Sequence, residues 1–211
     1  MQDIIFPKCC LICGKLSKDI YCKECKNKIF ENLKFEIDII RDTSFYFERH
    51  IYLFEYKNNI RNLILDYKFN DKSYLYKLFS EIIIKNEKIY GILKKYDIII
   101  PVPIHKRRKK QRGYDQSELI SRDLTKNIKE LEFENAIQKT KNNLRQSLLS
   151  KEQRKQNVQN AYKLTNIEKI KDKKIILFDD IYTTGNTVNE CAKILKQNGA
   201  KEIIVLTIAK D

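Results

Sequence analysis

The stretch that decides the fold of this 211-residue chain reads Lys173-Lys174-Ile175-Ile176-Leu177-Phe178-Asp179-Asp180-Ile181-Tyr182-Thr183-Thr184-Gly185-Asn186-Thr187. An apolar run flanked by lysines and followed by a turn is typical of a buried strand in a parallel sheet. A helix is expected directly after the turn, because apolar residues recur there at helical spacing: Val188, Cys191, Ala192 and Leu195. The sequence therefore predicts an α/β fold, in which ligands bind beyond the carboxyl ends of parallel strands.

Two carboxylates, Asp179 and Asp180, stand at that strand end. Adjacent carboxylates suit a ribose, because each can accept hydrogen bonds from neighbouring hydroxyls. The turn that follows offers backbone N–H groups at the start of a helix, where the helix dipole favours a phosphate. A Mg²⁺ site or a solvated turn is the alternative interpretation. The residues expected to hold the phosphate are Thr183, Thr184, Gly185, Asn186 and Thr187.

The segment from Phe178 to Thr187 resembles the signature of the type I phosphoribosyltransferases, which bind phosphoribosyl pyrophosphate (PRPP). The resemblance implies that Asp179 and Asp180 are catalytic carboxylates that hold the ribose. It also implies that the loop of residues 183–187 holds the 5′-phosphate and that Mg²⁺ accompanies PRPP. Other nucleotide-binding folds are disfavoured, because the chain contains neither G-x-x-x-x-G-K-[ST] nor G-x-G-x-x-G.

Five of the six cysteines fall in the first 25 residues, as two C-x-x-C pairs plus Cys9. Two such pairs predict a structural zinc site with four thiolate ligands, and Cys9 is an alternative first ligand. A disulfide framework would need an oxidising compartment, yet residues 1–30 contain no apolar run of signal-peptide length. We therefore expect a cytoplasmic protein. The predicted zinc ligands are Cys10, Cys13, Cys22 and Cys25.

The length of the chain allows one good core and one small appendage. We expect a zinc-knuckle module over residues 1–45 and a phosphoribosyltransferase-like domain over residues 46–211, with a parallel sheet flanked by helices. The 42 Lys and Arg residues outnumber the 28 Asp and Glu residues, which gives a net charge of +14 and favours a polyanionic partner. The positive charge is concentrated over residues 105–155, which contain fifteen Lys and Arg and seven Asp and Glu.

The run of residues 96–105 predicts a second buried strand that ends in a loop, and the prolines of the run fix the backbone of that loop. Six cations lie among the seven residues from Lys106 to Arg112. In a loop, such a run binds a pyrophosphate or a nucleic-acid backbone, or it is simply a solvated basic surface. The residues expected to bind pyrophosphate are Pro103, Arg107, Arg108 and Arg112, and those expected to bind DNA are Lys106, Arg107, Arg108, Lys109 and Lys110.

The remaining segments carry little visible chemistry. Lys68 and Phe69 are interpreted as core or surface residues. Residues 140–149 are expected to form a loop that closes over a charged ligand, and residues 150–160 a capped helix. Hydrophobic periodicity predicts a strand over residues 51–56, helices over 59–69 and 74–84, a helix from Gln116 and a last strand over 202–209.

Together these motifs resemble the ComF family of competence-associated proteins, which join an N-terminal cysteine knuckle to a phosphoribosyltransferase domain. The resemblance implies a role in natural transformation, with single-stranded DNA and competence-machinery proteins as partners. One departure is Asp115, which stands where many relatives have Asn. The markers are the two cysteine pairs, Pro101-Val102-Pro103, Arg112-Gly113-Tyr114-Asp115-Gln116, Gln146 to Arg154 with Asn157 and Ala161-Tyr162, and Asp179 to Thr187.

Three activities agree with the sequence. The first is a Mg²⁺-dependent phosphoribosyltransferase, although no segment indicates the acceptor. The second is a binding module that senses PRPP or grips DNA, with Tyr21, Tyr114 or Tyr162 as stacking residues. The third is a scaffold of a DNA-uptake assembly. Turnover of PRPP would identify an enzyme. Saturable PRPP binding without turnover would identify a sensor, and the absence of both turnover and binding would identify a scaffold.

Overall fold

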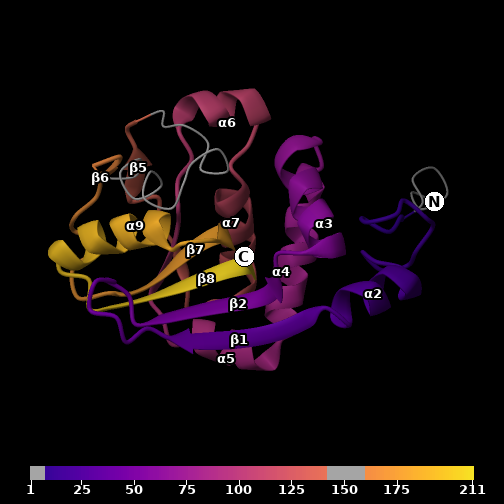
Figure 1. Ribbon diagram of the computed structural model, residues 1–211, viewed down its shortest axis with the longest axis horizontal. Coiled ribbons are helices and arrows are strands. Elements are labelled where there is room, and N and C mark those ends of the chain that lie inside the picture. Colours follow the sequence, from indigo (N-terminus) through magenta and orange to yellow (C-terminus); the bar gives the residue numbers. More distant parts are fainter. Residues whose placement is uncertain (1–7, 142–159) are drawn as a thin grey trace.

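The computed structural model describes residues 8–141 and 160–211 (Figure 1). It contains a six-stranded sheet in the order β1-β2-β8-β7-β3-β4. All neighbouring strands are parallel to each other, except that β1 is antiparallel to β2. This confirms the predicted α/β fold with a parallel sheet. The strands are β1 (Leu33–Ile39), β2 (Arg49–Glu55), β8 (Glu202–Lys210), β7 (Lys174–Tyr182), β3 (Ile98–Pro101) and β4 (Glu132–Phe133).

Helices cover both faces of the sheet (Figure 1). One face packs against α3 (Asn58–Phe69), α4 (Tyr76–Lys85), α5 (Glu87–Leu93) and α7 (Gln116–Asn127), and a short 3₁₀ helix, η1 (Ser73–Leu75), joins α3 to α4. The other face packs against α9 (Asn186–Gln197) and a two-stranded sheet of β5 (Ile137–Lys139) and β6 (Tyr162–Leu164).

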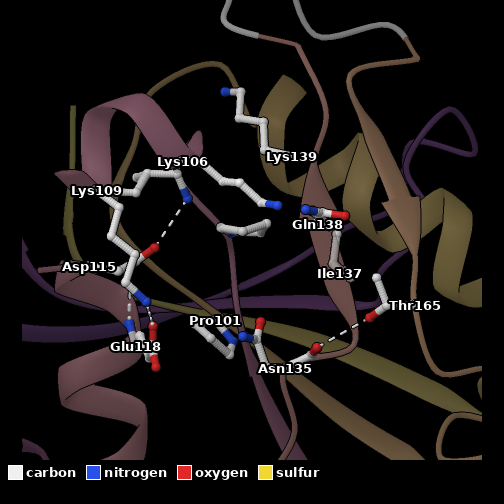
Figure 2. A pocket seen from close by; sticks show the side chains of 12 residues that line it. Pro101, Lys106, Lys109, Asp115, Glu118, Asn135, Ile137, Gln138, Lys139 and Thr165 are labelled. Atoms are coloured by element: carbon white, nitrogen blue, oxygen red, sulfur yellow. Dashed lines mark hydrogen bonds and ion pairs between the residues drawn. The ribbon is translucent and has the colours of Figure 1, made fainter.

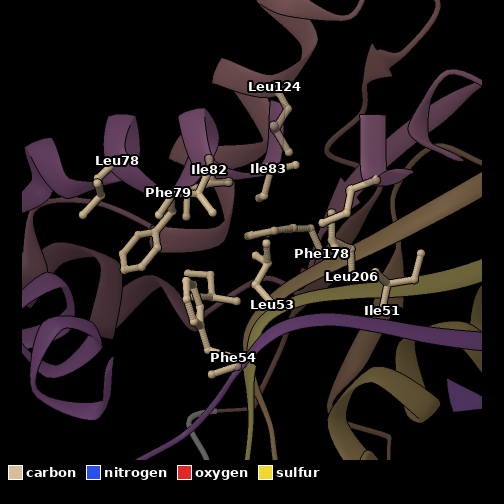
Figure 3. Close-up of a cluster of buried hydrophobic side chains, with 14 of the residues drawn as sticks. Ile51, Leu53, Phe54, Leu78, Phe79, Ile82, Ile83, Leu124, Phe178 and Leu206 are labelled. Atoms are coloured by element: carbon tan, nitrogen blue, oxygen red, sulfur yellow. The ribbon is translucent and has the colours of Figure 1, made fainter. Parts of the chain in front are cut away.

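Strand β7 is buried on both faces, which explains its uninterrupted apolar run. Ile175 and Leu177 pack in the core under α9, whereas Ile176 and Phe178 pack in the core under α3, α4 and α7. Figure 3 shows Phe178 in this second core, together with Leu124 of α7 and other fully buried side chains. Because alternate residues of a strand face opposite ways, a strand covered on both sides needs apolar residues at every position.

The N-terminal cysteine segment packs onto the main body of the protein. Cys10, Cys25 and Ile29 belong to the same buried cluster as the side chains of α3 and α4, and α2 (Lys23–Phe30) follows the cysteine pairs. Strand β1 lies within residues 1–45 and is the edge strand of the six-stranded sheet. The division into residues 1–45 and 46–211 stays a prediction, and the sheet begins before residue 46.

The basic run after β3 is a helix, α6 (Lys106–Arg112), and its interpretation as a loop was wrong. Residue His105 caps the helix, because its side chain accepts a hydrogen bond from the Arg107 N–H at 3.2 Å. At the other end, Gly113 takes the left-handed conformation with φ 79° and stops the helix. Lys, Arg and Gln are good helix formers, so two caps suffice for this short segment.

The predicted strands at residues 51–56 and 202–209 and the helices at 59–69 and 74–84 match β2, β8, α3 and η1–α4 to within a few residues. The predicted closing loop, the capped helix after it and the marker from Gln146 to Arg154 with Asn157 lie outside or largely outside the described residues. Among the described helices, none has the length and apolar content needed to cross a membrane.

Candidate functional site

Asp179 and Asp180 lie at the carboxyl end of β7, between the parallel strands β3 and β8. Residue Phe178, directly before them, pairs with Pro101 at the end of β3. Oδ1 of Asp180 is 2.8 Å from Nζ of Lys68 at the end of α3, and their side chains are only 13% and 16% exposed. The ion pair holds the Asp180 carboxylate in place in the middle of the carboxyl edge of the sheet.

The two neighbouring carboxyl groups have different environments. Burial raises the pKa of Asp179 to about 8, the charge of Asp180 adds to the rise, and Lys68 opposes it. One carboxyl oxygen of Asp179 accepts a hydrogen bond from the Asp180 N–H at 2.9 Å and another from the Ser117 hydroxyl at 3.4 Å. The raised pKa favours the protonated form of Asp179, whereas Asp180 is paired with a cation.

The loop after β7 is built around Gly185, which precedes the first residue of α9 and has φ 74°. A Cβ at this position would collide with the Tyr182 hydroxyl and lie 3.0 Å from Cε1 of Phe45, so the site needs glycine. The loop and Asp179 line a small hollow of about 30 Å³. Oγ1 of Thr184 is buried without a hydrogen-bond partner among the described residues. A buried hydroxyl without a partner and a helix N-terminus together fit a bound anion.

A cavity of about 440 Å³ lies beyond the end of β3, and we call it the α6–β5 cavity. Figure 2 shows Lys106 of α6 and Gln138 of β5 extending toward each other across it. Nζ of Lys109 is 2.5 Å from Oε2 of Glu118, so this cation is already paired. The volume and the mixed lining suit a small polar ligand. The lining residues are Pro101, Pro103, Ile104, Lys106, Lys109, Asp115, Glu118, Asn135, Ile137, Gln138, Lys139 and Thr165.

A second pocket, of about 210 Å³, lies between the end of α3 and another side of α6, and we call it the α3–α6 pocket. Its cations are Lys68, Arg108 and Arg112, and its one acidic residue is Asp71. The other lining residues are Phe69, Gln111 and Tyr114.

The structure separates the residues expected to bind pyrophosphate. Pro103 lines the α6–β5 cavity, Arg108 and Arg112 line the α3–α6 pocket, and Arg107 is exposed and lines neither. The residues expected to bind DNA are divided in the same way. Lys106 and Lys109 face the cavity, Arg108 faces the pocket, and Lys110 is exposed. Helix α6 thus has cations on several sides.

Residue Asp115 ties the loop after β3 to α7. It is buried, and its carboxylate accepts hydrogen bonds from the Glu118 N–H at 3.2 Å and the Ile104 N–H at 3.1 Å. Burial raises the pKa of this carboxyl group, and the two N–H donors oppose the rise. Its position as helix cap explains an acidic residue inside a basic segment.

Sequence reasoning missed two lysines of the site. Lys68 was interpreted as a core or surface residue, yet it pairs with Asp180. Lys139 lines the α6–β5 cavity, and burial and the nearby Arg108 lower its pKa. Both lysines reach the strand end through contacts between distant parts of the chain, so no local pattern marks them.

The two cysteine pairs form one compact group. The Sγ atoms of Cys10, Cys13, Cys22 and Cys25 all lie within 4.8 Å of one another, and those of Cys13 and Cys22 are 3.8 Å apart. Four thiolates at about 2.3 Å from Zn²⁺ in a tetrahedron would be about 3.8 Å apart, so the group fits this ion. Cys9 is exposed and outside the group, in a β-bridge with Leu16.

Backbone N–H groups prepare Cys10 for a metal. Its burial favours the neutral thiol, but hydrogen bonds from the backbone of Cys13, Cys22 and Ile12 outweigh this effect and lower the pKa of Cys10 to about 6. Gly14, with φ 75°, forms the tight turn after the first pair, where its N–H donates to the Cys10 carbonyl at 2.9 Å. A thiol with a lowered pKa is a good metal ligand.

Residues 114–211 match the model of the phosphoribosyl transferase domain. The chain is 31% identical to competence protein F of Haemophilus influenzae over 152 residues, which are 70% of this chain and 66% of that protein. It is 33% identical over 114 residues to the DNA utilization protein YhgH of Shigella flexneri, covering 54% of this chain and 49% of the relative. With competence protein ComFC of Streptococcus pneumoniae it shares 27% identity over 161 residues, 76% of this chain and 68% of the relative.

The chain therefore spans about two thirds of the Haemophilus protein and about half of the Shigella protein. The matched phosphoribosyl transferase domain contains β7, the two strand-end carboxylates and the loop before α9. The four cysteines precede this matched domain in the sequence. By its sequence relatives, its domain and its fold, this chain belongs to the ComF family.

Proposed function

We propose that the strand-end site binds PRPP with Mg²⁺. The observation that carries the proposal is the placement of Asp179 and Asp180 directly before a loop whose Gly185 has φ 74° and opens α9. A sugar with two hydroxyls and a phosphate on the same molecule matches two carboxylates that precede a helix N-terminus by six and seven residues.

We assign a set of residues to each part of PRPP. Asp179 and Asp180 would accept hydrogen bonds from the ribose hydroxyls, and the N–H groups and hydroxyls of residues 183–187 would hold the 5′-phosphate. The pyrophosphate would lie toward the end of β3, in the α6–β5 cavity that Pro103 and Lys106 line. Arg108 and Arg112 line the separate α3–α6 pocket, so the predicted arginine contacts to pyrophosphate are not part of this proposal. Mg²⁺, when bound with PRPP, would neutralise charge on the pyrophosphate and make it a better leaving group.

The same arrangement supports phosphoribosyl transfer. As pyrophosphate leaves C1, positive charge develops on the ribose, and the negative charge of Asp180 would stabilise it. A PRPP sensor without turnover needs the same contacts but no acceptor. Calorimetry with PRPP and Mg²⁺ tests binding, with ribose 5-phosphate and pyrophosphate titrated separately to assign each half of the site. Release of pyrophosphate in the presence of candidate acceptors then separates enzyme from sensor, and absence of PRPP binding would contradict the proposal.

We propose single-stranded DNA as a second ligand. The observation that favours it is α6, on which Lys106, Arg107, Lys109 and Lys110 are exposed on one short helix. Two of the relatives are named for competence and for DNA utilization. Phosphate contacts of this kind carry no base information and weaken as salt rises. Competence-machinery proteins are the partners that we propose for such a role.

A matched pair of variants tests the role of α6. Changing the five residues Lys106 to Lys110 to Ser should weaken oligonucleotide binding and make its dependence on salt shallower. The control changes five exposed lysines elsewhere to Ser and removes the same charge. Equal losses in both variants would mean that only the net charge matters and would contradict a site on α6. The control residues are Lys88, Lys95, Lys129, Lys171 and Lys173.

We also propose that the four-thiol group holds a structural Zn²⁺. Four thiolates satisfy this ion without an open position, so the role would be to stabilise the N-terminal segment and not to catalyse. Thiols that bind zinc must stay reduced, which agrees with a cytoplasmic protein.

A further inference from the structure

The α3–α6 pocket is distinct from the α6–β5 cavity, because the two lie against different faces of the same helix. Arg108, Gln111 and Arg112 are spaced three and four residues apart, so they share one face of α6 and line the pocket. Lys106 and Lys109 are three residues apart on another face and line the cavity. A ligand can therefore occupy the pocket while another occupies the cavity.

An aromatic platform forms one wall of the pocket. Phe69 is the last residue of α3 and is 49% exposed, so one part of its ring is open to a ligand. The guanidinium carbon of Arg112 lies 4.8 Å from the centre of the Phe69 ring. Nη1 of Arg112 also donates to the Gln116 side-chain oxygen at 2.8 Å, which fixes the guanidinium group over the ring. Aromatic rings and arginine planes are the surfaces on which nucleobases stack.

The charges beside this platform favour a ligand that also carries a phosphate. Three cations, Lys68, Arg108 and Arg112, line the pocket together with one acidic residue, Asp71. The Gln111 amide offers a donor and an acceptor of the kind that reads the edge of a base. A planar base joined to a phosphate matches this combination better than either group alone.

The pocket is also connected to the carboxyl edge of the sheet. Lys68 lines the pocket and pairs with Asp180 at 2.8 Å. A phosphate in the pocket would compete with Asp180 for the same ammonium group. Occupancy of the pocket and of the strand-end site would then be coupled, and by linkage the coupling would be reciprocal.

We propose that the α3–α6 pocket binds a nucleotide, with its base on the platform of Phe69 and Arg112 and its phosphate beside Lys68 and Arg108. The nucleotide is either free or one unit of a single strand. As one unit of a single strand, the nucleotide rests on and deepens the proposed DNA binding; as a free nucleotide it goes beyond the proposed function, and neither form needs PRPP. Only the coupling through Lys68 rests on the proposed PRPP site.

The test compares two oligonucleotides of equal length and charge, one of thymidines and one of abasic sites. Fluorescence anisotropy of labelled strands should show that the wild-type protein prefers the strand with bases. Phe69→Ala should remove this preference through a loss of about 5- to 100-fold in affinity for the thymidine strand, and leave the affinity for the abasic strand unchanged. Phe69→Tyr should keep the preference.

The matched control is Phe30→Ala, because Phe30 is also an exposed phenylalanine at the end of a helix. It should keep the preference, and both alanine variants should melt as cooperatively as the wild type. Calorimetry with AMP distinguishes a free nucleotide from one unit of a single strand. Saturable AMP binding that Phe69→Ala removes would show that the pocket binds a free nucleotide. A wild-type protein that binds abasic and thymidine strands equally and does not bind AMP would overturn the proposal, as would a preference that Phe30→Ala removes and Phe69→Ala keeps. Binding of PRPP and of the abasic strand, measured separately, distinguishes failure here from failure of the proposed PRPP and DNA binding.

Discussion

Nζ of Lys68 and Oδ1 of Asp180 are 2.8 Å apart, and this ion pair joins the end of α3 to the end of β7. Both side chains are largely buried, so removal of the cation would leave a poorly solvated carboxylate. Lys68 lies in a helix that otherwise packs apolar side chains against the sheet. The pair therefore connects a structural helix to the candidate site.

Substitution Lys68→Met should lower the free energy of unfolding by about 3 kcal/mol, because it breaks a buried ion pair. Urea denaturation at pH 7 measures the loss, and Lys68→Arg should retain most of the stability. The control is Lys94→Met, since Lys94 and Glu130 form a pair of similar length, 3.0 Å, with 41% and 45% of the side chains exposed. Its effect should stay below about 1 kcal/mol. Equal effects of Lys68→Met and Lys94→Met would contradict the structural role of the buried pair.

The raised pKa of Asp179 predicts how stability changes with pH. The folded protein binds a proton at Asp179 up to a pKa of about 8, whereas the unfolded chain releases it near the usual value of about 4. Between these values the folded state holds the extra proton, so stability falls as pH rises and levels off above about 8. Asp179→Asn does not titrate and should escape this loss.

The difference in unfolding free energy between Asp179→Asn and the wild type should therefore grow from pH 5 to pH 8, by at most about 1.4 kcal/mol for each pH unit. Urea denaturation at pH 5, 7 and 9 measures it. A difference that stays constant over this range would show that Asp179 has an ordinary pKa in the folded protein.

Substitution Gly185→Ala should destabilise the protein by more than about 1 kcal/mol, because φ 74° disfavours alanine and its Cβ would collide with the Tyr182 hydroxyl. Gly91→Ala is the matched control. Gly91 lies inside α5, and a Cβ there would meet no atom within 4 Å, so alanine should stabilise the helix by up to about 1 kcal/mol. The melting temperature should fall for Gly185→Ala and rise for Gly91→Ala. A Gly185→Ala variant that melts at or above the wild-type temperature would contradict the strained loop geometry.

Metal analysis of the purified protein should find about one zinc per chain. Cys22→Ser should lose the metal, because three thiolates bind Zn²⁺ much more weakly than four. Cys9→Ser is the control, since Cys9 lies outside the four-thiol group, and it should keep the metal. Loss of zinc in Cys9→Ser with retention in Cys10→Ser would mean that Cys9 is the first ligand.

The central part of the fold could be predicted because its signals are local. Strand β7 has apolar residues at four successive buried positions, and α9 shows a clear buried face of Val188, Cys191, Ala192 and Leu195. The spacing of the cysteines likewise predicted a four-thiol group, and only the contact geometry distinguishes Cys10 from Cys9.

The rest depended on a local helix cap, on a contact between distant residues and on a strand without a hydrophobic pattern. The cap that His105 provides to α6 turned an expected loop into a helix, and this helix directs its cations to different pockets. Lys68 is 112 positions from Asp180 in the sequence, and no periodic pattern relates the two. Strand β1 carries exposed or half-buried residues, so the sequence of this edge strand shows no hydrophobic pattern from which it could be predicted.

The measurement that tests the PRPP site most directly is calorimetric titration of PRPP and Mg²⁺ into the wild type and into a variant with both Asp179→Asn and Asp180→Asn. The site predicts saturable binding to the wild type with one PRPP per chain. Because each charge-assisted hydrogen bond contributes about 1.5 to 3 kcal/mol, the variant should bind at least about tenfold more weakly and still unfold cooperatively. Equal affinity of the two proteins for PRPP would contradict the assignment of the strand-end carboxylates to the ribose.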